Sequence, residues 1–480
     1  MSSTTFPELT FRPKLSFLSE PQINEIHWAS LEVLERTGMV IKHPRILAAL
    51  AEAGCRVVGE RVRFPSYLVE QCIRQAPSRL VLGDRHGKRS VFLQSDYSWF
   101  GPSLDCLSYL DPTDGSRGPM KVEHCEGIAR LVDGLPNFKW SMTTGMIQDC
   151  PAAIADKVAA RIAMTHTKKS LIFCCNTVEN LRDIYEMALV VTDGKENFDN
   201  APLLLHYSET LAPLTYYGPA MDKLIFCCEH HLPVIIVSAP QSGATGPASL
   251  TGNLVLANAE ALSGLVISQI ISPGTPFVYG IQSTIMDMRT TIFCYGAIEQ
   301  TMILSAAAQM ARFYGLPIFS VAGCTDSKYN DAQAGIEAAI QCLAIAASGS
   351  GLVHDCGGWL DHGSIASPEN LVMVNEIVSM VMQYMKGMPT NPESLAVDLI
   401  DEIGPGGNYL LHPSTRKLCR EMFIPKLFDR SMAEKPGQPK FDERLRSLTL
   451  DLMKHETRPL AEDKARELER MEKSWYKAVA

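Results

Sequence analysis

The chain has 480 residues, of which 46% are hydrophobic and 20% are charged, and this composition excludes disordered and collagen-like proteins. Its 44 Lys and Arg against 53 Asp and Glu give a formal net charge of −9, so no overall positive field attracts nucleic acid or anionic lipid. The 14 cysteines are scattered and form no CxxC pair, which is typical of free, mostly buried thiols. The first 14 residues lack the apolar core of a secretory signal, and we expect a cytoplasmic protein that does not enter a membrane.

The N-terminal part of the chain predicts helices and a hairpin. Apolar residues recur at helical spacing over 21–37 and 44–53. A hairpin is expected over 79–94, with its turn at His86-Gly87, and a second one around 111–115. We assign residues 1–95 to an extension that caps the main domain.

From residue 98 onward, short apolar β-type segments recur, and each is followed by a longer helical pattern. The segments are almost wholly apolar, as parallel strands covered on both faces require. Their spacing leaves room for one strand, one helix and two loops each time. Eight such units predict an α/β protein with a (β/α)8 TIM barrel over 96–403. The eight expected strands are 98–101, 140–145, 170–176, 202–207, 233–238, 276–280, 317–321 and 352–354.

The last part of the chain, 404–480, is expected to form a C-terminal helical arm. Helical patterns cover 391–403, 416–428 and the charged stretch 462–477, and a loop with two prolines over 431–440 leads into the arm. The helical segments at both ends of the chain offer surfaces for a second subunit, so a homo-oligomer is a reasonable expectation.

Chemistry in a TIM barrel takes place at the C-terminal ends of the strands, and aromatic residues are frequent near the expected strands. An aromatic, net-negative pocket suits a quaternary ammonium, because ring faces attract a cation that has no N–H to donate. His354 and Gln282 are the expected donors to a substrate carboxylate, and His354 and Tyr97 are expected to position the substrate. Any single ring is about equally well explained as barrel filler. The expected cage consists of Tyr97, Trp99, Tyr207, Tyr279 and Trp359.

A zinc site is the main alternative for the same region. His354 and Cys356 are two residues apart on a strand and would face the same side, and Cys324 ends the neighbouring strand. Such a His-Cys-Cys set is found in zinc-dependent thiol methyltransferases. The frequency of buried cysteines in ordinary cores favours a site without bound metal.

Several separate segments, in the same order, resemble the trimethylamine methyltransferase superfamily. The resemblance extends from about residue 11 to residue 429. The segments that carry it are 111–115, 258–260, 284–287, 323–328, 331–335, 396–398 and 402–407.

This resemblance implies a TIM barrel that moves a methyl group from a methylated amine to Co(I) of a corrinoid. The chain has no Asp-x-His-x-x-Gly corrinoid-carrying motif, so a separate corrinoid protein would supply the cofactor. The trimethylamine enzymes have a pyrrolysine at or next to the position of Cys324, where this chain has an ordinary residue. Members without pyrrolysine resemble quaternary amine demethylases. The chemistry explains why they need no pyrrolysine, because a quaternary nitrogen leaves as a neutral amine without further activation.

Among quaternary amines, the His and amide donors near a compact aromatic set favour glycine betaine as the first choice of substrate, giving dimethylglycine. Proline betaine, carnitine and γ-butyrobetaine follow closely. A zinc-dependent thiol methyltransferase and a non-catalytic osmolyte-binding barrel remain open as alternatives.

Overall fold

The computed structural model describes residues 12–94, 97–103, 105–432 and 437–479, so the first 11 residues and part of the expected loop 431–440 lie outside it. Eight parallel strands form its central sheet, in the order β6-β19-β18-β15-β13-β11-β10-β9. All eight expected strands and the predicted TIM barrel are confirmed. The strands are β6 (Trp99–Phe100), β9 (Trp140–Met142), β10 (Ser170–Phe173), β11 (Leu204–Glu209), β13 (Val234–Ser238), β15 (Phe277–Ile281), β18 (Ile318–Val321) and β19 (Leu352–His354).

The barrel closes between its first and second strands, β6 and β9. Phe100 bridges to Phe138, and the backbone N–H of Lys139 donates to the carbonyl of Phe100 at 2.8 Å. Gly101 lies at this seam, where a Cβ atom would come within 2.1 Å of the Trp140 indole. Only a residue without a side chain allows the strands to meet around this large buried ring.

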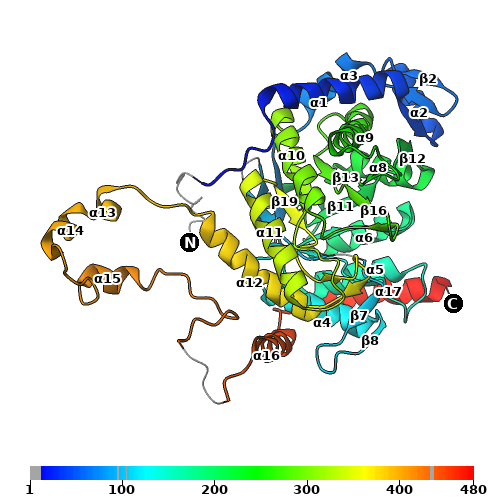
Figure 1. Cartoon of the computed structure of the whole chain (residues 1–480). Coiled ribbons are helices and arrows are strands. Elements are labelled where there is room, and N and C mark those ends of the chain that lie inside the picture. Colours follow the sequence, from blue (N-terminus) through cyan, green and yellow to red (C-terminus); the bar gives the residue numbers. More distant parts are fainter. Residues whose placement is uncertain (1–11, 95–96, 104, 433–436, 480) are drawn as a thin grey trace.

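A ring of helices surrounds the barrel (Figure 1). Several start where a side chain accepts a backbone N–H of the first turn, as Thr177, Ser249 and Ser367 do. The helices that follow the strands are α4 (Val122–Gly134), α5 (Ala155–His166), α6 (Val178–Val191), the short α7 (Lys195–Asn200), α8 (Gly218–His230), α9 (Leu250–Ile271), α10 (Ile298–Tyr314), α11 (Ala332–Ser348) and α12 (Pro368–Tyr384).

Helix α9 is apolar all round because it is covered on both sides. Strands β13 and β15 lie inside it, and the N-terminal helices lie outside it. By length and composition it could cross a membrane, but 78% of its most apolar stretch is buried inside the molecule.

Two polar residues of α9, both within the family-like segment 258–260, connect this helix to its neighbours. Asn258 donates to Ser30 and Tyr314 and accepts from the Tyr279 hydroxyl, over distances of 2.8–2.9 Å. Glu260 accepts hydrogen bonds from the Ser238 hydroxyl and from the loop after β11. These bonds fix the ends of β11 and β13 relative to the helix layer.

The N-terminal extension packs on the outer face of α9. The two expected helices are confirmed as α1 (Glu20–Glu32), which continues into a π-helical turn η1 (Val33–Thr37), and α2 (Pro44–Glu52). The expected hairpin is confirmed as β4 (Leu80–Gly83) and β5 (Arg89–Leu93). Sequence periodicity did not reveal the three-residue strands, which are too short to show it, nor the helix after them. These are β1 (Met39–Ile41), β2 (Arg56–Val58), β3 (Arg61–Arg63) and α3 (Ser66–Gln75).

Short strands lie in the loops at the C-terminal end of the barrel. The second expected hairpin is confirmed and belongs to a small sheet with a turn from the loop after β19. Its strands are β7 (Ser108–Leu110), β8 (Arg117–Pro119), β20 (Trp359–Leu360) and β21 (Ile365–Ala366). A second small sheet contains β14 (Gln241–Ser242), β16 (Thr284–Asp287) and β17 (Ile292–Phe293). The short strand β12 (Thr215–Tyr216) pairs instead with β1 in the N-terminal extension.

After α12 the chain leaves the barrel as an arm and then returns (Figure 1). The arm contains α13 (Pro392–Leu395), α14 (Val397–Ile403) and α15 (Pro413–Leu418). The expected helix at 416–428 is wrong, because the helix ends at Leu418 and apolar residues that follow it, such as Met422 and Ile424, are exposed. The chain returns as α16 (Phe441–Met453), which packs on α4 and α12 and was not expected. The expected charged helix is confirmed as α17 (Glu462–Val479), which packs on α5 and α6.

The seam at Gly101 gives a direct test of the barrel closure. We expect Gly101→Ala to lower the free energy of unfolding by about 1–3 kcal/mol, because the added methyl group overlaps the Trp140 ring. Gly118→Ala is the matched control, since a Cβ atom there meets nothing within 4 Å. Thermal denaturation of both variants measures the effect, and equal midpoints would contradict the proposed role of Gly101.

Candidate active site

Polar side chains from four strands meet inside the C-terminal end of the barrel. Tyr207 and Glu209 are two residues apart on β11 and face the interior, where the Tyr207 hydroxyl donates to the Glu209 carboxylate. Gln282, just after β15, lies with its Oε1 atom 3.0 Å from the Tyr207 hydroxyl, and its Nε2 donates to the Tyr295 hydroxyl at 3.1 Å. The amide of Gln282 therefore connects Tyr207 of β11 to Tyr295 of the loop after β17.

Aromatic rings surround these polar groups. The His354 ring, at the end of β19, stacks on Phe319 with centroids 3.8 Å apart, and Tyr207 packs edge-on against both. Trp359 and Tyr295 form a second pair, with centroids 4.9 Å apart at an interplanar angle of 69°. Rings in these orientations present faces of negative quadrupole charge to a central cation.

Three carboxylates share this space. Burial raises the pKa of Asp105 to about 7, and the neighbouring charges of Glu209 and Asp355 act in the same direction, while a hydrogen bond from the Cys174 thiol lowers it. Burial also raises the pKa of Glu209, against the hydrogen bond from Tyr207 and the nearby His354. Oδ1 of Asp355 lies 3.0 Å from Nδ1 of His354, and neither of the two side chains is exposed. The site therefore concentrates negative charge in a place where ionisation is costly.

Glu209 keeps accessible surface within the site. Protein surrounds its side chain closely enough to raise the pKa of the carboxyl, yet the residue is exposed.

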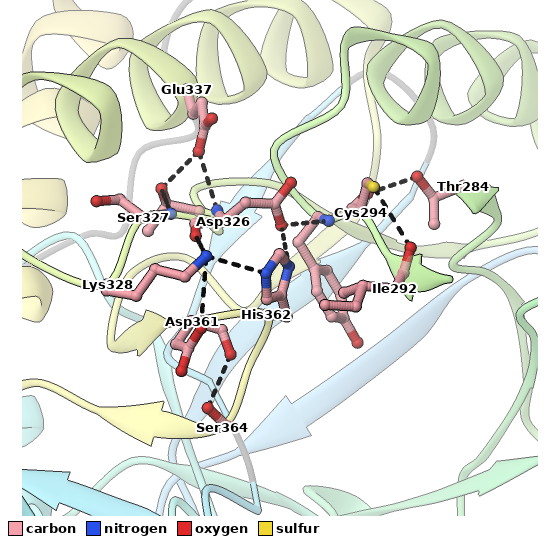
Figure 2. Close-up of polar contacts among 12 residues, drawn as sticks. Thr284, Ile292, Cys294, Asp326, Ser327, Lys328, Glu337, Asp361, His362 and Ser364 are labelled. Carbon is pink, nitrogen blue, oxygen red and sulfur yellow. Dashed lines mark hydrogen bonds and ion pairs between the residues drawn. The ribbon is translucent and has the colours of Figure 1, made fainter. Parts of the chain in front are cut away.

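A polar network fastens the loops that hold Tyr295 and Trp359 (Figure 2). Oδ1 of Asp326 accepts from the backbone N–H of Tyr295 at 2.8 Å and lies 2.9 Å from Nδ1 of His362. Nζ of Lys328 lies 3.2 Å from Nε2 of the same ring, so a neutral His362 donates from Nδ1 and accepts at Nε2. His362 belongs to the turn between β20 and β21, and its neighbours on both sides share its left-handed backbone. The network thereby holds both loops over the site.

The structure places Tyr97 and Trp99 at the other end of the barrel. Trp99 is the first residue of β6, and its indole N–H donates to the carbonyl of Phe92 in the β4–β5 hairpin at 2.8 Å. Tyr97 packs on Trp99 and under the Arg12 guanidinium. These two rings fasten the N-terminal extension to the barrel bottom and are separated from Tyr207 by the length of the strands.

Tyr279 faces away from the interior of the barrel. Its hydroxyl donates to Asn258 on α9, and its ring packs against Tyr314 on α10. Of the seven expected substrate contacts, the structure brings together Tyr207, Gln282, His354 and Trp359.

The three residues of the alternative zinc site do not converge. Cys356 lies against Cys342 of α11, with 3.5 Å between the sulfur atoms, whereas His354 faces Phe319 inside the barrel. Cys324 is buried and donates to the carbonyl of Asp355, and burial raises its thiol pKa well above the usual range. Within the described parts of the chain, no group of three or more His, Cys, Asp or Glu residues could hold a metal ion.

Sequence reasoning missed three residues of the site, which are Asp105, Cys174 and Tyr295. Cys174 lies within the expected strand 170–176 and directly follows β10, and Asp105 comes shortly after β6, so their place at the C-terminal ends of strands could have indicated them. Tyr295 comes after the β16–β17 hairpin, and no local pattern places that loop over the barrel.

Comparisons with known proteins agree with this architecture. The sequence profile of the trimethylamine methyltransferase (MTTB) family matches residues 2–472. A glycine betaine methyltransferase of Desulfitobacterium hafniense is 33% identical over 437 residues, which cover 91% of each chain. The trimethylamine methyltransferase MttB of the same species is 30% identical over 454 residues, covering 93% of this chain and 91% of that one.

Solved structures show the same fold at greater distance. The monomethylamine methyltransferase MtmB of Methanosarcina barkeri superposes with a TM-score of 0.50 at 10% identity, covering 91% of this chain and 88% of that one. The match of the family profile over nearly the whole chain is decisive, and the chain is a methyltransferase that belongs to the trimethylamine methyltransferase family.

Proposed function

We propose that this protein transfers a methyl group from a quaternary amine to Co(I) of a corrinoid carried by a separate protein. Glycine betaine, giving dimethylglycine, is the first substrate to test. The observation that carries the proposal is the convergence of Asp105, Glu209 and Asp355 with the rings of Tyr207, Tyr295 and Trp359. The 33% identity to a glycine betaine methyltransferase supports the same substrate class.

In this proposal the chain acts by binding and orientation. The carboxylates offset the fixed positive charge of the substrate nitrogen, and the rings pack against its methyl groups. One N–CH3 bond then points toward the open C-terminal face, where the Co(I) of the partner supplies the nucleophile. The amine leaves as a neutral molecule, so no side chain has to donate a proton.

The state of Cys324 agrees with a reaction that needs no covalent intermediate on the protein. Its thiol is buried and neutral, because burial raises its pKa, and a neutral thiol is a poor nucleophile. The backbone N–H groups of Gly323 and Cys324 both donate to Oε1 of Gln341, which fixes the end of β18.

The rim of the barrel fits a partner protein that carries a corrinoid. Large apolar side chains are exposed in the loops after several strands, at the end where the site opens. Exposed apolar residues around an opening are typical of a docking surface. Those at this rim include Leu107, Met146, Leu211 and Met288.

We also propose that the reaction takes place in the cytoplasm. The 14 cysteines are free thiols, and Co(I) is stable only under reducing conditions.

A quaternary amine without a carboxylate is the second candidate substrate. The excess of negative charge in the site favours it, because a substrate carboxylate would approach Asp105 and Glu209. Among the described residues that face one another in the site, His354 and the second N–H of the Gln282 amide can offer an N–H to a substrate carboxylate. Carnitine and proline betaine place their carboxylates farther from, or at a different angle to, the nitrogen than glycine betaine does.

Anaerobic methylation of free cob(I)alamin tests the function and the substrate together. We expect methylcobalamin, followed by its visible spectrum, with one quaternary amine from a panel of glycine betaine, proline betaine, carnitine and choline. We expect none with trimethylamine. Turnover with trimethylamine alone would contradict the proposed substrate class. No turnover with any amine, even with a cognate corrinoid protein, would contradict the proposed methyl transfer and favour a protein that only binds its ligand.

A pair of variants links the same assay to the site. Glu209→Gln keeps the shape of the side chain and a hydrogen-bond acceptor for Tyr207 but removes the charge, so it should raise KM roughly tenfold or more. Glu179→Gln, on the exposed first turn of α6, is the matched control and should leave KM unchanged.

The pKa of Asp105 predicts how binding depends on pH. A quaternary cation favours the ionised carboxylate, so protonation below about pH 7 weakens binding. We expect the Kd of glycine betaine to rise by up to about tenfold from roughly pH 8 to roughly pH 6. Isothermal titration calorimetry measures this change.

Asp105→Asn should flatten this pH dependence, whereas Asp114→Asn, on the exposed turn between β7 and β8, should preserve it. A Kd of the wild type that does not change over this range would show that Asp105 does not act on the bound cation.

A further inference from the structure

The arm between α12 and α16 presents apolar side chains to solvent. Leu411 is 94% exposed, Ile424 is 76% exposed and Leu410 is 73% exposed. Contiguous apolar surface of this kind marks a site of association in soluble proteins. The returning end of the arm is anchored on the barrel, since Leu427 is buried and the backbone N–H of Lys426 donates to Glu376 of α12 at 2.6 Å.

The outer faces of α11 and α12 form an apolar groove with a volume of about 830 Å³. Ile336 and Leu343 of α11 line one wall, and Met380 and Tyr384 of α12 line the other. All four are exposed, although they lie on helices whose opposite faces pack in the barrel.

The groove and the second half of the arm carry complementary charge. The second half of the arm, residues 409–424, has three basic residues (Arg416, Lys417 and Arg420) and one acidic residue (Glu421), a net charge of +2. The groove is bordered by Asp331 and Asp442, and none of the described residues that line it is basic.

The position of the groove makes a reciprocal contact possible. Tyr384, where the arm begins, and Phe428 and Phe441, where it returns, line the groove as well. The arm itself reaches away from the groove and from its own barrel (Figure 1). A two-fold axis next to the groove would bring each arm to the groove of the other copy, so that the same contact forms twice.

We propose that two copies of this chain exchange their arms, with residues 409–424 of each copy seated in the α11–α12 groove of the other. Each contact covers the apolar side chains of this segment and of the groove together and brings its basic residues to the acidic border. The resulting dimer leaves the C-terminal face of each barrel open for substrate.

Analytical ultracentrifugation of the full chain tests the dimer. We expect the wild type to sediment as a dimer and two variants to sediment as monomers at the same concentration. The arm variant is Leu411→Asp with Ile424→Asp, and the groove variant is Ile336→Asp with Met380→Asp. Val58→Asp, at an exposed apolar residue of β2, is the matched control and should remain a dimer.

Mixing the two monomeric variants identifies the surfaces in contact. The groove variant has an intact arm and the arm variant has an intact groove, so the mixture retains one arm–groove contact and should form a heterodimer. Contacts between two arms, or between two grooves, would give no association on mixing. A wild type that is monomeric, or a mixture that stays monomeric, would overturn the proposal, and circular dichroism shows whether each variant is folded.

Discussion

Three carboxylates held close together inside a barrel repel one another, and this repulsion determines what the site can bind. Burial and mutual charge raise the pKa of Asp105 to about 7, so the site gains most from a ligand that brings positive charge. The proposed substrate, a quaternary ammonium, brings a permanent charge and no N–H, and the rings of Tyr207, Tyr295 and Trp359 would pack against its methyl groups. The polar and aromatic parts of the site therefore favour the same class of ligand.

The rest of the fold places these groups and holds them in position. Asn258 and Glu260 connect α9 to β15, to β13 and to the loop after β11, the strand that carries Tyr207 and Glu209. His362, between Asp326 and Lys328, connects the loops of Tyr295 and Trp359 (Figure 2). The N-terminal extension packs on α9 from outside and so supports the helix that carries Asn258 and Glu260.

The sequence predicted the barrel well, because strands that are apolar on both faces, followed by helices, leave few other architectures. The same property hid the direction of individual side chains. Tyr279 lies on an expected strand but faces α9, and nothing in an apolar strand shows which alternate residues point inward. Tyr97 precedes its strand and therefore lies at the end of the barrel opposite the site.

The residues that were missed belong to loops and to surfaces whose partners lie far away in the sequence. Tyr295 reaches the site only because the β16–β17 hairpin and Asp326 hold its loop there. The apolar residues of 416–428 predicted a helix on a core, whereas they lie on an arm outside the barrel. Local periodicity records that a residue is apolar but not which part of the molecule, or which copy of it, will cover that residue.

A crystal structure with glycine betaine, or with choline if betaine does not bind, tests the central claim most directly. The account predicts the quaternary nitrogen among Tyr207, Tyr295 and Trp359, within about 6 Å of at least two ring centroids and next to Glu209. Ligand bound instead beside Tyr97 and Trp99 at the opposite end of the barrel, or a site filled without contact to these rings and carboxylates, would contradict it.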